Sequence, residues 1–537
     1  MKSWIRANQA GYTPNREKKA IVLSETDISG AAWGLKKDGK TILSGELSSP
    51  GRGDDFHVAQ EFYYTIDFSA ATEQGIYSLE LENAEAQKII VNENPYELFA
   101  AQAIGHLRRM RSGCATDVSG ASHPGDAAAI VYEVSGDWRQ GAWKEAVPRR
   151  TVDMHGGHYD AGDCIKFTLT EANMVWHLLR AYEENPALFA KEQILGEAKY
   201  GLDYLAKTFP DENTFVVQVG DGKDHIVSRP LPETEVLDGK RPALCALSRV
   251  HMGVTAAALA LGAHVFAETD REAAALYASK AKAIYARARQ NDTQTSAFER
   301  DHVNDFYYDE TDVDNMALAA AELYRLTKEQ KYLDDGKAYA PPPVSSVSWS
   351  LLNGQANHRL AEAGDVDAKK RLLDEAALYN CENVWSLPGG EYTWGSLPVW
   401  IGMANNLVFA RRLSGERTQP APFLRVLDYT FGRNNWGLAM LASEALPNPV
   451  KNIYSWISFR LGKYVTGALS EGPGKKAMHD GLSGHFETPR GGPLDKFNTS
   501  EAVFFDNGED FMIQESTIWG QGNLILMLAL AGAPKAQ

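Results

Sequence analysis

Two carboxylates lie three residues apart in a glycine-rich segment, HGGHYDAGDCIKF at 155–167. Asp160 and Asp163 directly precede a stretch with helical spacing. Asp and Gly are common in turns, and an aspartate before a helix can accept hydrogen bonds from its first amides. Two neighbouring carboxylates on a tight loop can instead orient and deprotonate a water molecule. The segment alone leaves both interpretations open.

The residues before this segment predict a small β-sandwich over 1–93. Short β-branched or aromatic runs are separated there by Gly, Asp, Asn and Ser. Strands with turns at this spacing are typical of sandwiches. The segment NENPYEL at 92–98 ends this pattern.

From residue 94 to residue 537 the apolar residues recur with helical spacing. Helical segments follow one another in consecutive pairs, with almost no strand between them. Stacked helical hairpins that close into a ring form an α/α barrel. We therefore expect a mainly α-helical second domain whose loops at one end form a cleft.

Aromatic residues on or near these loops are candidates for stacking against sugar rings. They are Tyr159, Tyr392, Trp394, Trp436 and Trp456. One tryptophan alone is more often a core residue, because most aromatic side chains are buried. A set of aromatics beside polar loops favours a binding cleft.

Composition excludes several classes of function. The chain has 537 residues, 44% of them hydrophobic, which predicts a large unit with a sizeable core and a smaller one. Its net charge of −16 at pH 7 argues against nucleic acid, whose phosphates require a basic surface. No apolar run is long enough to span a membrane, so we expect no membrane partner.

The cellular compartment is predicted only weakly. The start MKSWIRANQAGY lacks the apolar core of a secretory signal, which predicts a cytoplasmic protein. A periplasmic or secreted location follows if a signal peptide has been removed. Four cysteines lack CxxC spacing, which weakly favours a reducing compartment.

Five segments in the same order resemble motifs of glycoside hydrolase family 9. They are IRANQAGYTP (5–14), GGHYDAGDCIKF (156–167), VVQVGDGKDH (216–225), LPGGEYTWGS (387–396) and DFMIQESTI (510–518). This resemblance implies an N-terminal immunoglobulin-like domain and an (α/α)6 barrel. It also implies an inverting, cellulase-like hydrolase that acts on a β-linked oligosaccharide or polysaccharide.

The resemblance assigns three catalytic carboxyl groups. It makes Asp163 the general base, Asp160 its partner in holding the attacking water, and Glu515 the general acid. Glu515 precedes the apolar run TIWGQGNLILMLALA, where partial burial would raise its pKa and keep it protonated. Without the resemblance, a glutamate stabilised by the N-terminus of a helix is the preferred explanation of Glu515.

The resemblance also implies a set of substrate contacts. They are His158, Tyr159, Asp221, His225, Tyr392, Trp394 and Arg460. Four positions depart from the family pattern, all at the end that contacts substrate. Ser458 and Phe459 replace a histidine pair, His158 replaces an aromatic residue, and Gly508 replaces an arginine.

These departures leave three hypotheses open. The first is an endoglucanase that cuts β-1,4-linked glucan. The second is an exo-acting enzyme that releases glucose or glucosamine from short oligosaccharides, favoured by the changed histidine region, the acidic surface and the long 115–155 connection. The third is a non-catalytic carbohydrate-binding protein, against which the three carboxylates argue.

No cofactor is required for this chemistry, because the carboxyl groups suffice. Cys114 and His123 fall near the places of a Cys/His set that holds structural zinc in several family members. Ser122 replaces the second cysteine of that set, so a complete tetrahedral site is not assured and we expect zinc to be absent. The loop FPDEN at 209–213 offers oxygen ligands for a structural calcium ion, although an acidic surface loop is the commoner explanation.

Overall fold

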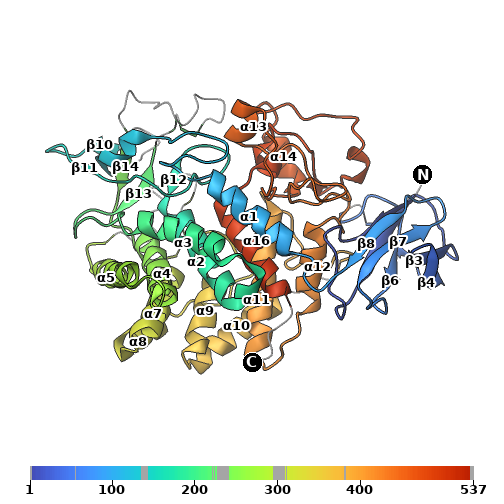
Figure 1. Ribbon diagram of the computed structural model, residues 1–537, viewed down its shortest axis with the longest axis horizontal. Helices are drawn as coiled ribbons and strands as arrows, with labels where there is room; N and C mark the ends of the chain where they lie inside the picture. Colours follow the sequence, from blue (N-terminus) through green and yellow to red (C-terminus); the bar gives the residue numbers. More distant parts are fainter. Residues whose placement is uncertain are drawn as a thin grey trace.

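The computed structural model describes residues 3–54, 56–134, 143–220, 222, 224–225, 241–293, 307, 309, 311–379 and 383–532. These residues form an all-β unit followed by a helical unit (Figure 1). The last strand of the β-unit ends at Val91, and the first helix begins at Glu97. This arrangement confirms the predicted fold class.

The β-unit consists of two four-stranded antiparallel sheets. One has the order β1-β2-β6-β5, with bounds Ser3–Arg6, Lys19–Ser24, Phe62–Asp67 and Gly51–Arg52. The other has the order β4-β3-β7-β8, with bounds Lys40–Glu46, Ala32–Lys37, Gly75–Leu81 and Gln87–Val91. Alternate residues of β7 are buried, as expected for a strand with one face on the core of a sandwich.

The helical unit is built from helices in consecutive pairs. Its longer helices are α1 (Glu97–Arg109), α2 (Thr168–Glu184), α3 (Lys191–Leu205), α4 (Arg249–Phe266), α5 (Arg271–Ala288), α7 (Val313–Thr327), α8 (Gln330–Ala338), α9 (Asn353–Glu362), α10 (Val366–Leu378), α11 (Ser396–Leu413), α12 (Ala421–Thr430) and α16 (Ile518–Ala531). The inner helices contact one another in the closed order α2, α4, α7, α9, α11 and α16. Every residue of α16 is buried, which explains why this helix is apolar on all sides.

Strands within the helical unit were not predicted. A sheet of order β10-β9-β14-β13-β12, with β11 also paired to β9, lies on the side of the barrel near α3 and α4. Its strands are β9 (Ala129–Val134), β10 (Trp143–Glu145), β11 (Thr151–Val152), β12 (Lys166–Phe167), β13 (Val216–Val219) and β14 (Pro242–Cys245). The β-branched runs AIVYEV and VVQV form β9 and β13, which lie on either side of the central strand β14.

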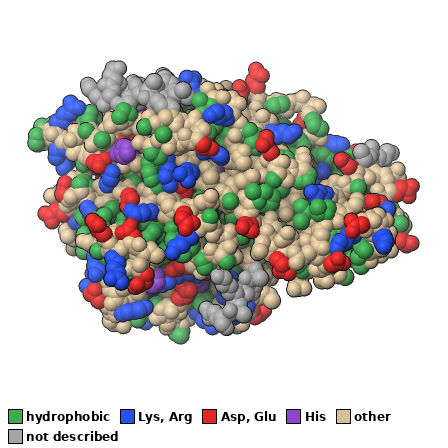
Figure 2. Space-filling model, in the orientation of Figure 1, with side chains coloured by type: hydrophobic (Ala, Val, Ile, Leu, Met, Phe, Trp, Pro, Cys, Tyr) green, Lys and Arg blue, Asp and Glu red, His purple; other side chains and the backbone are tan. Residues whose placement is uncertain are grey.

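Shorter elements complete the loops of the helical unit. They are η1 (Pro124–Ala128), η3 (Pro186–Leu188), α13 (Trp456–Leu461), β15 (Gly474–Lys475), α14 (Lys476–Gly481), η4 (Asp495–Phe497), β16 (Ala502–Val503) and α15 (Phe511–Gln514). None of the described helices combines the length and apolarity needed to cross a bilayer. Acidic and basic side chains intermingle on the face shown in Figure 2, unlike the basic face of a nucleic-acid-binding protein.

A buried polar contact joins the two units. The side-chain amide of Asn8 donates to Asp428 Oδ1 at 2.8 Å, and Arg16 forms an ion pair with the same carboxylate. The Arg16 and Asp428 side chains are 5% and 1% exposed. Asp428 lies on α12, beside which Figure 1 shows the β-unit. The start of the chain therefore supplies the charge partner of a barrel residue.

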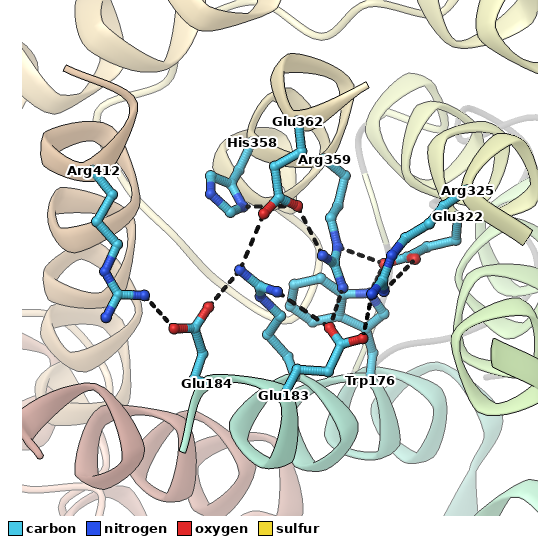
Figure 3. Close-up of polar contacts among 10 residues, drawn as sticks. Trp176, Glu183, Glu184, Glu322, Arg325, His358, Arg359, Glu362 and Arg412 are labelled. Carbon is cyan, nitrogen blue, oxygen red and sulfur yellow. Dashed lines mark hydrogen bonds and ion pairs between the residues drawn. The ribbon is translucent and has the colours of Figure 1, made fainter. Parts of the chain in front are cut away.

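An ion-pair network closes the end of the barrel where the inner helices finish (Figure 3). Arg359 lies at its centre, with nitrogen atoms 2.7 Å from Glu322, 2.9 Å from Glu183 and 2.8 Å from Glu362. Arg359 is in the last turn of α9, where a cation also interacts favourably with the helix dipole. Burial raises the pKa of Glu183, but the charges of Arg359 and neighbouring arginines outweigh it and lower that pKa to about 2.

We expect Arg359→Met to destabilise the barrel. The substitution keeps an unbranched apolar stem but leaves three carboxylates without their shared cation, and removing one partner of a buried pair costs about 3–5 kcal/mol. Urea unfolding followed by circular dichroism measures the change. Lys370→Met is the control, because its pair with Asp374 is exposed and contributes under about 1 kcal/mol. Equal unfolding midpoints for the two variants would show that the network does not stabilise the fold.

Candidate active site

A cavity of about 630 Å³ opens at the end of the barrel where the inner helices begin. Phe167, Gly395 and Thr517 line it, and each immediately precedes an inner helix, namely α2, α11 or α16. The remaining lining residues are Asp160, Ala161, Asp163, His225, Tyr307, Trp349, Trp394, Val399, Tyr454, Glu471, Phe511, Glu515 and Trp519. The barrel therefore brings together carboxylates and aromatics from segments that are far apart in the sequence.

Backbone hydrogen bonds fix the two carboxylate-bearing loops to each other. The amide of Gly162 donates to Glu515 Oε1 at 2.9 Å, and the amide of Ile518 donates to the carbonyl oxygen of Asp160 at 2.8 Å. A Cβ atom at Gly162 would lie 2.6 Å from the ring of Tyr454 and 2.7 Å from its carbonyl oxygen. Glycine is required at this position because no side chain fits.

Asp160 is 1% exposed, and both of its carboxylate oxygens accept hydrogen bonds. The hydroxyl of Thr170 donates to Oδ1, and the hydroxyl of Tyr307 donates to Oδ2. Burial raises the pKa of Asp160 to about 7, and the charges of Asp163 and Glu171 add to this rise, whereas the two hydroxyl donors oppose it. The carboxyl group therefore changes its charge near neutral pH.

Asp163 lies beside a histidine at the cavity wall. Asp163 Oδ1 accepts a hydrogen bond from the amide of Ile165 at 2.9 Å, and Oδ2 lies 2.6 Å from His225 Nδ1. Burial lowers the pKa of His225, but the hydrogen bond and charge of Asp163 outweigh burial and raise it. The backbone amide and the imidazole together fix the orientation of this carboxylate.

Glu515 is the carboxyl group best suited to donate a proton. Burial raises its pKa well above the usual value, and the charge of Asp163 adds to the rise, although the Gly162 amide opposes it. A protonated carboxyl and a pair of aspartates able to hold water thus line one cavity, which is the arrangement that acid–base chemistry needs. Glu515 is partly buried, as its position before the apolar run predicts.

Aromatic side chains form two walls of the cavity. Trp394, 42% exposed, lies with its ring 5.7 Å from that of Phe511, which in turn is 5.9 Å from the ring of Tyr454. On the other side, the Trp349 ring packs edge-on against Tyr307 at 5.3 Å and Trp519 at 6.1 Å. Such surfaces fit the apolar faces of sugar rings.

Five of the residues predicted from the sequence line this cavity. They are Asp160, Asp163, His225, Trp394 and Glu515. The structure places His158 and Tyr159 elsewhere, in the protein interior. His158 Nδ1 is 2.9 Å from Glu171 Oε1, and the Tyr159 hydroxyl donates to Ser122 at 2.6 Å. Neither side chain lines the cavity, and these contacts anchor the loop to its surroundings.

Two further predicted substrate contacts, Tyr392 and Arg460, are not among the described lining residues. Tyr392 is 3% exposed and packs against Trp400 with ring centres 5.5 Å apart. Arg460 lies exposed on α13 and does not line the cavity. Asp221 lies outside the described residues. Trp436 and Trp456, grouped with the cleft aromatics from the sequence, are both 1% exposed core residues.

Several lining residues were missed. Tyr307 and Trp349 lie in segments without a recognisable motif, so the sequence offered no sign of them. Glu471 did offer one, since LSEGPG at 469–474 places a carboxylate beside glycines as the 155–167 segment does. Burial of Glu471 raises its pKa to about 8.

The predicted metal ligands are not grouped into a site. Across the described parts of the chain, no three His, Cys, Asp or Glu side chains are placed to hold a metal ion. The ring of His123 is buried and packs edge-on against Tyr159 at 5.7 Å. Cys114 is partly exposed and free. In the 209–213 loop, Asp211 accepts a hydrogen bond from the Asn213 amide at 2.9 Å, which is a turn contact.

Comparisons with known proteins agree with this architecture. The model of glycosyl hydrolase family 9 matches residues 94–528, and the model of the cellulase N-terminal ig-like domain matches residues 1–86. Endoglucanase C of Cellulomonas fimi is 24% identical over 88% of this chain, which spans only 47% of that protein's length. Cellodextrinase of Butyrivibrio fibrisolvens is 23% identical over 98% of this chain and 99% of its own.

A solved structure shows the same fold. AaCel9A in complex with cellobiose-like isofagomine superposes with a TM-score of 0.79 at 19% identity, covering 98% of this chain and 99% of the other. The likeness therefore extends through both units, the β-sandwich and the barrel.

We expect Tyr307→Phe to move the acidic limb of the pH–rate profile to higher pH. Loss of the hydroxyl removes a hydrogen bond that lowers the pKa of Asp160, so this carboxyl stays protonated to a higher pH. A shift of about one pH unit is expected for a bond to a charged acceptor. The profile of kcat/KM for the hydrolysis expected from the sequence measures it.

The control for this experiment is Tyr324→Phe, a tyrosine on α7 remote from the cavity. It should leave the acidic limb in place. A limb that stays unmoved in Tyr307→Phe would mean that the charge of Asp160 does not control the reaction.

Proposed function

Because the chain belongs to glycosyl hydrolase family 9, we propose that it hydrolyses β-1,4-linked glucan or its oligosaccharides with inversion at the anomeric carbon. The relatives named endoglucanase C and cellodextrinase support this substrate class. The observation that carries the proposal is the meeting of Glu515 with Asp160 and Asp163 at one aromatic-walled cavity.

The three carboxyl groups divide the work of an inverting hydrolysis. Glu515 donates its proton to the glycosidic oxygen as the bond to the anomeric carbon breaks. Asp163 accepts a proton from the attacking water, and Asp160 holds that water with it. The raised pKa of Glu515 favours the protonated form that the acid needs at neutral pH. These proton transfers need no metal, so we propose that no cofactor takes part in the chemistry.

The sugar-binding surface supports a short substrate. Trp394, Phe511 and Tyr454 offer stacking surfaces beside the carboxyl groups. Ser458 occupies one position of the replaced histidine pair, and its hydroxyl donates to the carbonyl oxygens of Ile453 and Ser455 at 2.6 and 2.9 Å. Because this hydroxyl bonds within its own loop, we expect it to add no hydrogen bond to a polysaccharide substrate.

Phe459 occupies the other position of that pair. It is 40% exposed and packs its ring 5.6 Å from that of Tyr454, which lines the cavity. The apolar ring of Phe459 thus occupies a position that holds a histidine in the family pattern. This favours exo-acting release from short oligosaccharides as the second candidate beside internal cutting of glucan.

Removal of either catalytic group should abolish most turnover. Glu515→Gln removes the proton donor and Asp163→Asn removes the base, and each should lower kcat about 10²–10⁴-fold. Initial rates on cello-oligosaccharides with unactivated leaving groups measure this loss. Glu509→Gln, an exposed glutamate six residues before Glu515, is the matched control and should keep full activity. Near-normal turnover by Glu515→Gln would show that Glu515 is not the general acid.

The first product should be the α-anomer. An inverting enzyme places water between base and anomeric carbon, so a β-linked substrate yields an α-configured sugar. Proton NMR of the fresh reaction, read before mutarotation, distinguishes the two anomers. An initial β-anomer signal would mean that an aspartate attacks the sugar directly, and the water-holding role of Asp160 would then be mistaken.

A further inference from the structure

Four buried charged side chains lie beside the loop at 155–167 that carries the two aspartates, and the proposed hydrolysis uses none of them. This Arg241 cluster consists of Asp126, Lys166, Asp224 and Arg241, which are 0%, 1%, 3% and 0% exposed. None of the four is among the described lining residues of the cavity. Two of them belong to the motifs GGHYDAGDCIKF and VVQVGDGKDH, which also carry Asp163 and His225. The cluster therefore needs an explanation other than contact with substrate.

Arg241 lies at the centre of this cluster. Its Nε donates to Asp126 Oδ1 at 2.8 Å, and its Nη1 donates to Asp224 Oδ2 at 2.6 Å. Lys166 Nζ lies 2.8 Å from Asp126 Oδ2. Burial raises the pKa of Asp126, but the charges of Lys166 and Arg241 outweigh burial and lower that pKa to about 2. The two cations and two carboxylates thus form a chain of ion pairs in the protein interior.

At one end of the Arg241 cluster, Lys166 holds the start of the 155–167 loop. Its Nζ donates to the carbonyl oxygens of Met154 and Gly156 at 2.7 and 2.8 Å. The amide of Met154 donates in turn to the carbonyl oxygen of Asp126 at 2.8 Å. Because Lys166 follows the two aspartates and its backbone partners precede them, this cation fixes the loop on both sides of the reacting groups.

At the other end of the cluster, Asp224 holds the backbone beside the general base. Its carbonyl oxygen accepts a hydrogen bond from the amide of Cys164 at 3.2 Å. Cys164 directly follows Asp163, and His225 directly follows Asp224. The side chains of these two neighbours meet, since His225 Nδ1 lies 2.6 Å from Asp163 Oδ2. The place of the imidazole therefore depends on how Asp224 is held.

Stability alone does not explain why this chain buries the cluster. Taking charges out of water is costly, and replacing a buried ion pair by apolar residues is often neutral or stabilising. A Cβ atom at Gly220 would lie 2.8 Å from Asp224 Oδ2, so a glycine with φ of +101° makes room for the ion pair. What the cluster supplies is geometry, because the planar guanidinium of Arg241 fixes two carboxylates at once.

We propose that Arg241 is a positioning residue of the hydrolysis, which acts through Asp224 to hold His225 against the general base Asp163. This role rests on the proposed function, and it adds a residue that affects the base without touching substrate. A misplacement of about 1 Å in a reacting group can cost about 10²-fold in rate. Loss of the ion pair should therefore lower kcat more than it weakens substrate binding.

The first test is kinetic. Arg241→Lys keeps the positive charge but loses the fork that bonds two carboxylates, and Asp224→Asn keeps the shape but removes the charge. Each should lower kcat on cello-oligosaccharides about 10- to 100-fold with little change in KM. Arg359→Lys is the matched control, because Arg359 is also buried among carboxylates but lies at the end of the barrel remote from the cavity. It should leave kcat unchanged.

The second test needs no substrate. Burial lowers the pKa of His225, but the hydrogen bond and charge of Asp163, together with the charge of Asp160, outweigh burial and raise it. Displacing the imidazole from Asp163 should therefore lower this pKa in Arg241→Lys and Asp224→Asn, and leave it unchanged in Arg359→Lys. An NMR titration of enzyme with isotope-labelled histidine measures the pKa, and His225→Asn identifies the signal.

The two tests separate the positioning role from the proposed function. A lower His225 pKa and a lower kcat in both cluster variants support the role of Arg241. An unchanged His225 pKa, a loss in KM alone, or an equal loss of kcat in Arg359→Lys overturns it and leaves the proposed function intact. Absence of turnover by the unmodified enzyme overturns the proposed function, and the titration then decides alone whether Arg241 places the imidazole.

Discussion

The hydrogen bond from the Gly162 amide to Glu515 is the contact on which the site depends. It joins the loop that enters the first inner helix, α2, to the loop that enters the last, α16. A second hydrogen bond runs in the opposite direction, from the Ile518 amide to the carbonyl oxygen of Asp160, so two hydrogen bonds join the loops. Closure of the barrel and the spacing of acid and base are therefore set by the same few atoms.

At both ends of the barrel, charged side chains lie where the dipoles of the inner helices affect them. The N-termini of α2, α11 and α16, which carry partial positive charge, border a cavity rich in carboxyl groups. Their C-termini, which carry partial negative charge, receive arginines such as Arg359 on α9 and Arg412 on α11. Burying four carboxyl groups at one end is less costly because the helix dipoles and the opposite end are arranged in this way.

The sequence predicts the backbone of the site better than its side-chain directions. Asp160, Asp163 and Glu515 lie in motifs that can be recognised from the sequence by their residues and by the order of the motifs along the chain. His158 and Tyr159 share the same motif, yet they face the interior because a partner at Ser122 or Glu171 is chosen by tertiary packing. Glu471 was missed because its place depends on a glycine 76 residues earlier, Gly395, and such pairings do not show in a local pattern.

The junction between Asp428 and the β-unit has a consequence for how this protein can be divided. Asn8 and Arg16 both bond to this buried carboxylate. They lie in the connection between β1 and β2, not in the barrel. Removing the β-unit would take both of these partners from Asp428 and expose barrel surface that is buried in the whole protein. The sandwich and the barrel are separate in sequence, but the positive charge that pairs with Asp428 of the barrel comes from Arg16 of the sandwich. The two units are therefore expected to unfold in one transition.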